Sequence, residues 1–292
     1  MLKEEFDALV PAVGGVNRRS FVRGALGTGF AASVLPALAQ TAIRTDSTGL
    51  DTGEVTIPVG EFRMPAYRAA PQGRSGLPVV LVVSEIFGVH AYIADVARRF
   101  ARAGFFAVAP ELFVRQGDAQ SCGEVGRLLA EVIDKVPDEQ VLRDLDASLA
   151  WARAQGADTS RSGITGFCWG GRITWLYAAH NPQLKAGVAW YGRLVGPTSP
   201  LQPRHPVDVA AALHGPVLGL YGEKDTGIPL ESVDRMKAAL AAGSAAAKRS
   251  EIVIYPDAPH AFHADYRPSF RKDAAEDGWR RCLDWFRARG LG

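Results

Sequence analysis

The sequence predicts an α/β protein with a mostly parallel, doubly wound sheet and helices on both faces. Short β-branched runs alternate with helical patterns after residue 50, an alternation typical of parallel strands joined by helices. We expect one domain over 53–292, preceded by a linker over 40–52. The 292 residues are 47% hydrophobic and 22% charged, with 33 basic and 31 acidic side chains. This balance fits a globular protein and argues against nucleic acid as a partner.

The expected strands are short and apolar. The run over 77–84 (LPVVLVVS) is continuous, as in a strand buried on both faces of a parallel sheet. The other expected strands are 105–110, 163–167, 185–191, 216–221 and 251–255. Helical patterns lie at 92–103, 125–136, 138–155, 230–242 and 270–289, where Gly104 ends the first helix and Pro137 separates the second from the third.

Residues 1–39 have the layout of an export signal. Arg18 and Arg19 precede a Gly/Ala-rich apolar stretch over 24–35, and Ala-Leu-Ala at 37–39 is a small-x-small cleavage pattern. The paired arginines indicate the twin-arginine type, so the export machinery is a transient partner and the protein is expected in the periplasm or outside the cell. The alternative is an N-terminal amphipathic helix, which the glycines weaken. No apolar run reaches the roughly 18 residues of a membrane span, so no stable membrane anchor is expected.

The most informative motif is GFCWGG at 166–171, between an expected strand and a helix that begins near Trp169. Glycines two residues before and after Cys168 give the spacing of the nucleophile elbow of the α/β-hydrolase fold, with cysteine in place of serine. Larger side chains would clash at those glycines. The helix N-terminus favours a thiolate and an oxyanion. The alternative is a glycine-rich turn around a buried structural cysteine.

The expected acid and base follow in the order that this fold requires. Asp225 follows the strand over 216–221, and His260 follows the strand over 251–255. Histidine suits a general base because its unperturbed pKa is near 6.5, and a carboxylate would fix its orientation. Two alternatives remain, namely that Asp225 only forms a turn and that His263 is the base.

A carboxylate ends the buried strand over 77–84. Glu85 opens the segment SEIFGVH at 84–90, where a buried charge is costly unless it is partnered. A helix cap or an ion pair would also explain it. The same loop supplies the second N–H group of an oxyanion hole in this fold, here expected from Ile86, and the first is expected from Trp169.

These motifs together resemble the dienelactone hydrolase family over about 54–287. The resemblance is carried by EIFG at 85–88, PELFVRQ at 110–116, GFCWGG at 166–171 and the loops of Asp225 and His260. It implies Cys168 as nucleophile, His260 as base and Asp225 as the orienting acid. It also implies that Glu85 holds the resting thiol and helps to deliver a thiolate when substrate displaces it. The reaction so implied is hydrolysis of an ester or lactone, as in dienelactone to maleylacetate, through a thioester acyl-enzyme without metal or organic cofactor.

One departure bears on the substrate. Family members that act on dienelactone are expected to bind its carboxylate with an arginine four residues after the catalytic histidine, and this position is Ala264 here. Arg267, Arg115 or Arg127 could reach the same space. We therefore expect a small ester or lactone as substrate. A general carboxylesterase is an alternative, as is a non-catalytic binding or thiol-redox protein.

The remaining side chains of interest have less specific roles. Trp190 and Tyr191 are candidates for pocket walls or for core. Cys282 lies on an apolar helix face and Cys122 in a loop, and a disulfide between them is an alternative to two free thiols. The remaining histidines lack the spacing of metal ligands and are expected at the surface or at helix caps: His90, His180, His205 and His214.

Overall fold

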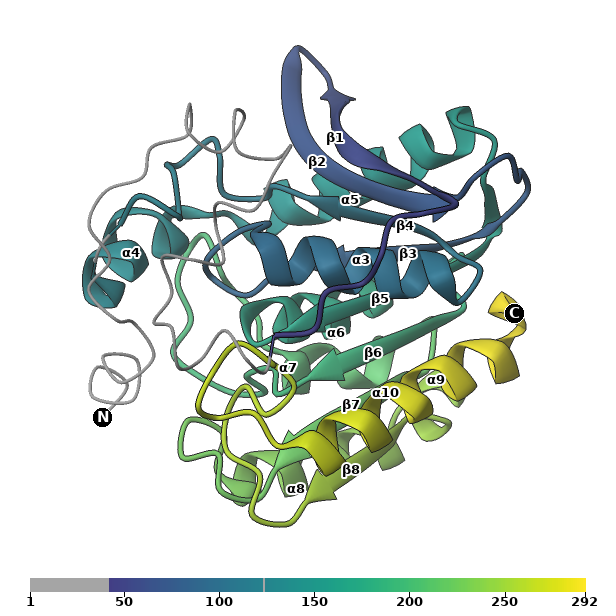
Figure 1. Ribbon diagram of the computed structural model, residues 1–292. Helices are drawn as coiled ribbons and strands as arrows, with labels where there is room; N and C mark the ends of the chain where they lie inside the picture. Colours follow the sequence, from purple (N-terminus) through teal and green to yellow (C-terminus); the bar gives the residue numbers. More distant parts are fainter. Residues whose placement is uncertain (1–41, 123) are drawn as a thin grey trace.

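The computed structural model describes residues 42–122 and 124–292, so the export signal predicted over 1–39 lies outside the described residues. In this part of the chain, an eight-stranded sheet has the order β1-β2-β4-β3-β5-β6-β7-β8 (Figure 1). The strands from β3 to β8 are parallel, whereas β2 pairs antiparallel with both β1 and β4. The strands are β1 (Leu50–Val59), β2 (Phe62–Pro71), β3 (Pro78–Val83), β4 (Phe106–Pro110), β5 (Asp158–Phe167), β6 (Ala186–Trp190), β7 (Val217–Gly222) and β8 (Glu251–Tyr255).

Helices cover both faces of this sheet. Helix α3 packs on β2 and β4 and α10 on β6, on the near face in Figure 1, whereas α5 and α6 pack on the opposite face. The longer helices are α3 (Ala91–Arg102), α4 (Val125–Glu131), α5 (Asp138–Ala154), α6 (Trp169–His180), α8 (Leu230–Ala241) and α10 (Lys272–Phe286). Short turns of helix lie at α7 (Pro206–Val209) and α9 (Ala245–Lys248). The predicted fold class, a mostly parallel sheet with helices on both faces, is therefore confirmed.

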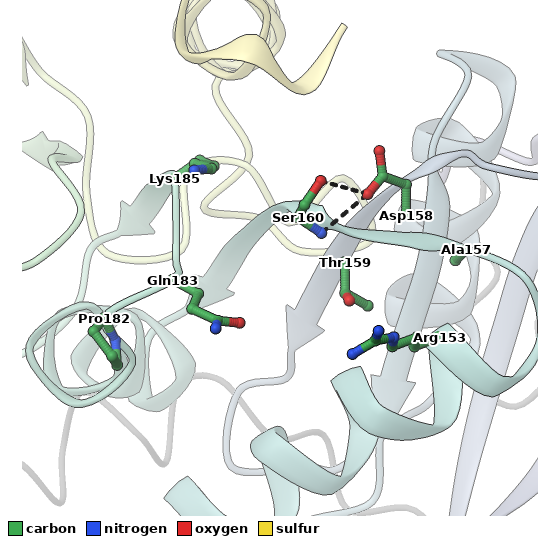
Figure 2. A pocket seen from close by; sticks show the side chains of 8 residues that line it. All are labelled: Arg153, Ala157, Asp158, Thr159, Ser160, Pro182, Gln183 and Lys185. Atoms are coloured by element: carbon green, nitrogen blue, oxygen red, sulfur yellow. Dashed lines mark hydrogen bonds between the residues drawn. The ribbon is translucent and has the colours of Figure 1, made fainter.

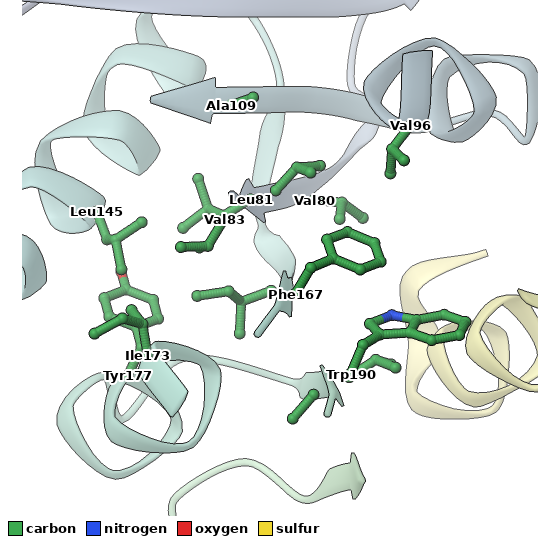
Figure 3. Packing of buried hydrophobic residues seen from close by; sticks show 14 of the residues in the cluster. Val80, Leu81, Val83, Val96, Ala109, Leu145, Phe167, Ile173, Tyr177 and Trp190 are labelled. Atoms are coloured by element: carbon green, nitrogen blue, oxygen red, sulfur yellow. The ribbon is translucent and has the colours of Figure 1, made fainter. Parts of the chain in front are cut away.

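The core lies between the parallel strands and these helices. Valine and leucine side chains from β3 pack against Phe167 and against side chains of α3, α5 and α6 (Figure 3). Trp190 is fully buried, and its indole N–H donates to the Thr165 hydroxyl over 3.1 Å. The sequence left open whether Trp190 forms a pocket wall or part of the core. The structure places it in the core.

The elements differ from the expected ones mainly at the edges. The β1–β2 hairpin was not predicted, and β1 begins at Leu50, within the expected linker. Strand β5 begins at Asp158, five residues before the expected 163, and its first four residues are partly exposed. The helix expected over 125–136 stops at Glu131, because Val132 leaves the helical region (φ −122°) before one further 3₁₀ turn forms.

Candidate active site

Cys168 joins β5 to α6 in a strained turn. Its φ of 54° and ψ of −112° lie in a region that residues with a side chain rarely adopt. Two backbone hydrogen bonds hold the turn, since the Cys168 N–H donates to the Trp190 carbonyl and its carbonyl accepts from the Gly171 N–H, each at 3.0 Å. Such strain persists where the surrounding structure over-determines it, and it projects the thiol above the carboxyl edge of the sheet.

The glycines around Cys168 are required by close backbone approaches. A Cβ at Gly166 would lie 2.1 Å from the carbonyl oxygen of Gly170, and a Cβ at Gly170 would lie 2.3 Å from that of Val83. A Cβ at Gly171 would lie 2.6 Å from the carbonyl oxygen of Trp190. The glycines thus let the first turn of α6 pack directly on the ends of β3 and β6.

Asp225 and His260 meet across two neighbouring loops. Asp225 follows β7 and His260 follows β8, and a Cβ at Gly222 would lie 2.1 Å from the Ala258 carbonyl oxygen, so only glycine allows the loops to pack this closely. The His260 Nδ1 lies 2.7 Å from Oδ2 of Asp225. The other oxygen, Oδ1, accepts the Gly227 N–H at 3.0 Å, and the carboxylate is fully buried. Both oxygens of Asp225 are therefore fixed.

The second ring nitrogen of His260, Nε2, is available to a ligand in the pocket that His260 lines. This nitrogen is buried and has no hydrogen bond of normal geometry among the described residues. The His260 ring packs edge-on against the Tyr191 ring, with 5.1 Å between the ring centroids. Burial lowers the pKa of His260, but the charges of Cys168 and Asp225 outweigh it and raise this pKa to about 10. His260 therefore carries a proton at neutral pH when a thiolate faces it.

His263 has a different environment. Its Nδ1 lies 2.5 Å from the Tyr92 hydroxyl, and its ring stacks on Phe167. Burial, followed by the charge of Arg99, holds the pKa of His263 well below its usual 6.5. A buried neutral histidine bonded to a tyrosine is a core residue. Of the two candidates for the base, the structure pairs His260 with Asp225.

Glu85 follows β3 and is buried next to the elbow. Its Oε1 lies 2.7 Å from Nε2 of His90 and accepts a hydrogen bond from the Tyr266 hydroxyl at 2.9 Å. Within residues 42–122 and 124–292 no hydrogen bond joins Glu85 to Cys168, and Oε2 is buried without a partner. Burial would raise the pKa of Glu85, but His90 and Arg267 hold it below its usual value. Glu85 is therefore an ionised carboxylate with one free oxygen.

One pocket gathers most of the predicted residues. Its lining is Glu85, Ile86, Phe87, Phe167, Cys168, Tyr191, His260, Ala261, Ala264 and Arg267. Tyr191 lines the pocket and is also fully buried in the core, so both alternatives left open for it apply. Two predicted residues lie just behind the lining. Asp225 supports His260, and Trp169 is the first residue of α6, with its indole edge-on to Phe113 at 4.7 Å.

Of the three arginines considered as carboxylate-binding residues, one lines the pocket and two do not. Arg267 lines the pocket, and its Nε donates to the Tyr266 hydroxyl over 2.9 Å while Nη1 is buried without a hydrogen-bond partner among the described residues. Arg115 is not brought to the pocket, because its guanidinium makes two hydrogen bonds to Asp144 at 2.6 and 2.9 Å. Arg127 pairs with Glu131 on the exposed side of α4. Arg267 is therefore the candidate that reaches the space beside Ala264.

Several remaining expectations can now be compared with the structure. Cys122 and Cys282 are both free, so the alternative of a disulfide between them is wrong. The expectation of a surface or cap role for His90 is incomplete, because His90 precedes α3 but directs its ring to Glu85. His90 shares the segment 84–90 with Glu85, which was the available signal. Tyr266 lies beside Arg267 in the sequence but carried no pattern of its own.

In residues 42–122 and 124–292, no group of three or more histidine, cysteine, aspartate or glutamate side chains could hold a metal ion. Within the same ranges, no helix has the length and apolar character needed to cross a membrane.

A second hollow opens at the amino end of β5 (Figure 2). It is lined by Arg153, Ala157, Asp158, Thr159, Ser160, Pro182, Gln183 and Lys185. Its lining contains no cysteine or histidine, and Ser160 bonds to Asp158 over 2.6 Å. The pocket beside Cys168 therefore remains the candidate active site.

The parallel sheet, the strained elbow and the acid–histidine pair at its carboxyl edge define a protein of the α/β-hydrolase fold. The chain belongs to the dienelactone hydrolase family, whose model matches residues 64–290. It is thus a dienelactone hydrolase-like hydrolase.

Relatives agree with this family over nearly the whole chain. A Methylorubrum extorquens protein named "Putative carboxymethylenebutenolidase" is 58% identical over 277 residues, covering 94% of both chains. An Escherichia coli K12 protein of the same name is 53% identical over 264 residues, covering 90% of this chain and 96% of that protein. A crystal structure of "Putative Dienelactone Hydrolase from Klebsiella pneumoniae subsp. pneumoniae MGH 78578" is 55% identical, has a TM-score of 0.79, and is matched over 82% of this chain and 98% of that one.

Proposed function

We propose that the protein hydrolyses an ester or lactone of the dienelactone type through Cys168, His260 and Asp225, with a thioester acyl-enzyme. The observation that carries the proposal is the fully buried Asp225 carboxylate at 2.7 Å from Nδ1 of His260, whose Nε2 is left unbonded in the pocket that contains Cys168. A buried carboxylate that fixes one ring nitrogen orients the other nitrogen for proton transfer.

The proposed chemistry consists of two acyl transfers. The Cys168 thiolate attacks the ester carbonyl carbon, and the C–O bond to the leaving alkoxide breaks as His260 donates its Nε2 proton to that oxygen. The neutral His260 then takes a proton from water, and the resulting hydroxide attacks the thioester. The thiolate leaves with the electron pair of the C–S bond, and His260 regains the imidazolium form.

An oxyanion hole is proposed at the end of β3. The Trp169 N–H lies in the first turn of α6, directly after Cys168, where helix N–H groups lack partners within the helix, and Ile86 lines the pocket beside Cys168. The close packing of Gly170 on the Val83 carbonyl brings these two segments together. Two backbone donors here would stabilise the tetrahedral oxyanion.

The pocket favours a substrate that carries its own carboxylate. Arg267 presents Nη1, buried and unbonded among the described residues, beside the apolar walls of Phe87 and Tyr191. A buried guanidinium without a full set of acceptors is a strong site for a carboxylate. The carboxymethylene group in the names of the relatives is consistent with such a substrate. We propose that Arg267 takes the role of the arginine missing at Ala264.

A burst-phase assay tests this proposal. The purified, reduced protein is mixed with p-nitrophenyl acetate or with cis- and trans-dienelactone, and iodoacetamide-treated enzyme is the control. We expect thiol-dependent turnover that Cys168→Ala abolishes while the circular dichroism spectrum is retained. Turnover by Cys168→Ala at the wild-type rate would refute the nucleophile. Turnover of the simple ester alone would support a general carboxylesterase, for which the alanine at position 264 is the favouring observation.

We also propose that the chain is exported in folded form by the twin-arginine route. The support is the sequence over 1–39, with Arg18 and Arg19 ahead of an apolar stretch. Cell fractionation of the wild type and of the double variant Arg18→Lys, Arg19→Lys tests it. We expect periplasmic protein from the wild type only, and equal export of both would rule out the twin-arginine route.

A further inference from the structure

The hydrogen bonds of Glu85 are strongly asymmetric. Both of them fall on Oε1, from His90 at 2.7 Å and from Tyr266 at 2.9 Å, while Oε2 has no partner among the described residues. An ionised carboxylate that is buried is costly unless donors surround it. The side chains that bond Oε1 therefore decide both the charge of Glu85 and which of its oxygens faces the pocket.

His90 is built to contact Glu85 rather than its own helix. It is the N-cap residue of α3 with an extended backbone, yet its side chain makes no capping hydrogen bond. Its ring is stacked with that of Tyr92, with 6.0 Å between the ring centroids, and meets the Tyr266 ring edge-on at a centroid distance of 5.4 Å. Only 11% of the His90 side chain is exposed. These two contacts restrict rotation of the ring and keep Nε2 directed at Oε1 of Glu85.

We propose that His90 is a positioning residue of the hydrolytic site, which holds Oε1 of Glu85 so that Oε2 remains free for the thiol of Cys168 or for substrate. Tyr266 is the second donor of the same clamp, and Arg267 fixes Tyr266 through a 2.9 Å hydrogen bond to its hydroxyl. This inference rests on the proposed function, because it assigns the residue that supports Glu85 in that site.

The clamp has an electrostatic consequence. The titratable and charged groups around Glu85 are His90, Arg267, Tyr266, Tyr191, Tyr92 and Cys168. Burial acts to raise the pKa of Glu85, and His90 is the strongest influence that lowers it. Without His90, Glu85 would take up a proton closer to neutral pH, and its free oxygen would no longer be a full acceptor.

Kinetics as a function of pH provide the first test. In His90→Phe we expect about a tenfold loss of kcat/KM at pH 7 and an acid limb that moves up by about one pH unit or more, the usual effect of removing a hydrogen bond that favours the ionised carboxylate. His90→Gln restores an N–H donor and should recover most of the loss. The matched control is His180→Phe, which breaks a histidine–carboxylate pair of the same 2.7 Å length, with Asp146, outside the site. It should leave both quantities unchanged.

A double-mutant cycle separates positioning from general damage. If His90 acts through Glu85, then His90→Phe should have no further effect on the acid limb in a Glu85→Gln background. An equal shift in that background would overturn the proposal. A loss in the His180→Phe control as large as that in His90→Phe would overturn it as well.

A spectroscopic readout keeps this test independent of catalysis. Carbon-13 NMR of the glutamate carboxyl groups, with the Glu85 signal assigned through Glu85→Gln, should show that the pKa of Glu85 rises in His90→Phe. An unchanged Glu85 titration would refute the role of His90, even if the enzyme hydrolyses esters. Absence of Cys168-dependent turnover in the wild type would instead refute the proposed function, and the titration would still report on the His90–Glu85 contact.

Discussion

The nucleophile elbow makes a sharp prediction for Gly166→Ala. The added methyl group would lie 2.1 Å from the carbonyl oxygen of Gly170 and 2.3 Å from its carbonyl carbon, both of which are backbone atoms. No side chain rotation can relieve such a contact. The first turn of α6 must move away from β5, and the Cys168 turn between them must move with it.

The size of the effect follows from the distances. The contact must open from 2.1 Å to the 3.4 Å of an ordinary van der Waals contact, a displacement of about 1.3 Å. Gly170 already packs closely on the Val83 and Ser84 carbonyls, which limits how far the helix can shift without a second clash. Overpacking of this kind costs about 3 kcal/mol. A misplacement of about 1 Å in a reacting group lowers the rate by roughly 100-fold.

Three measurements on Gly166→Ala check this reasoning. Urea unfolding gives the loss in unfolding free energy, steady-state hydrolysis gives kcat/KM, and the rate of alkylation by iodoacetamide reports on the Cys168 thiol. The matched control is Gly126→Ala in α4, where a Cβ would meet nothing closer than 3.8 Å and where alanine favours the helix. Wild-type stability and activity in Gly166→Ala would refute the argument that the close approach requires glycine.

Three further predictions concern polar groups in the site and in the core behind it. Asp225→Asn should lower kcat/KM by about 10³- to 10⁴-fold, because the amide supports the wrong tautomer of His260, and the pKa of His260 should fall below about 10. Steady-state kinetics and proton NMR of the ring would check both, and a loss below tenfold would contradict the orienting role. Arg267→Met should raise KM by about 10- to 100-fold more for a carboxylate-bearing ester than for a neutral ester, as parallel kinetics on both would show. His263 is held neutral in the folded protein, whereas in the unfolded chain it titrates near 6.5, so stability should fall as the pH drops below 6.5. At pH 5 the loss of stability is at most about 2 kcal/mol, the limit for a histidine that stays neutral in the folded state. Urea unfolding between pH 5 and 8 would give the free energies of unfolding of the wild type and of His263→Gln. The two values should converge as the pH falls, and a constant difference between them would refute the assignment of His263 as neutral in the folded protein.

Much of the central fold could be predicted because its signals are local. The apolar run over 77–84 and the pattern over 92–103 match β3 and α3 to within a residue or two at either end. The glycine spacing around Cys168 reflects backbone contacts that no other residue permits, so it could be interpreted without the structure. The order of Asp225 and His260 along the chain follows from where β7 and β8 end.

The edge of the sheet could not be predicted in the same way. Apolar alternation marks only the second half of β1, at Val55, Ile57 and Val59, and Pro58 and Pro65 argue against strands inside a sheet. The pairing of β1 and β2 depends on contacts with each other and with β4. The same reasoning applies to Arg115, since Asp144, its partner, lies 29 residues away on α5.

The two carboxylates of the site differ in how completely their oxygens are bonded, and this difference assigns their roles. Asp225 has both oxygens fixed, by His260 and by the Gly227 N–H, so it can orient the imidazole but cannot respond to a ligand. Glu85 has one oxygen fixed by His90 and Tyr266 and one oxygen without a partner among the described residues. A carboxylate in this condition can gain or lose a contact when substrate enters, without any change in the fold. The environments of paired acidic groups thus separate a permanent support from a group that acts during the reaction.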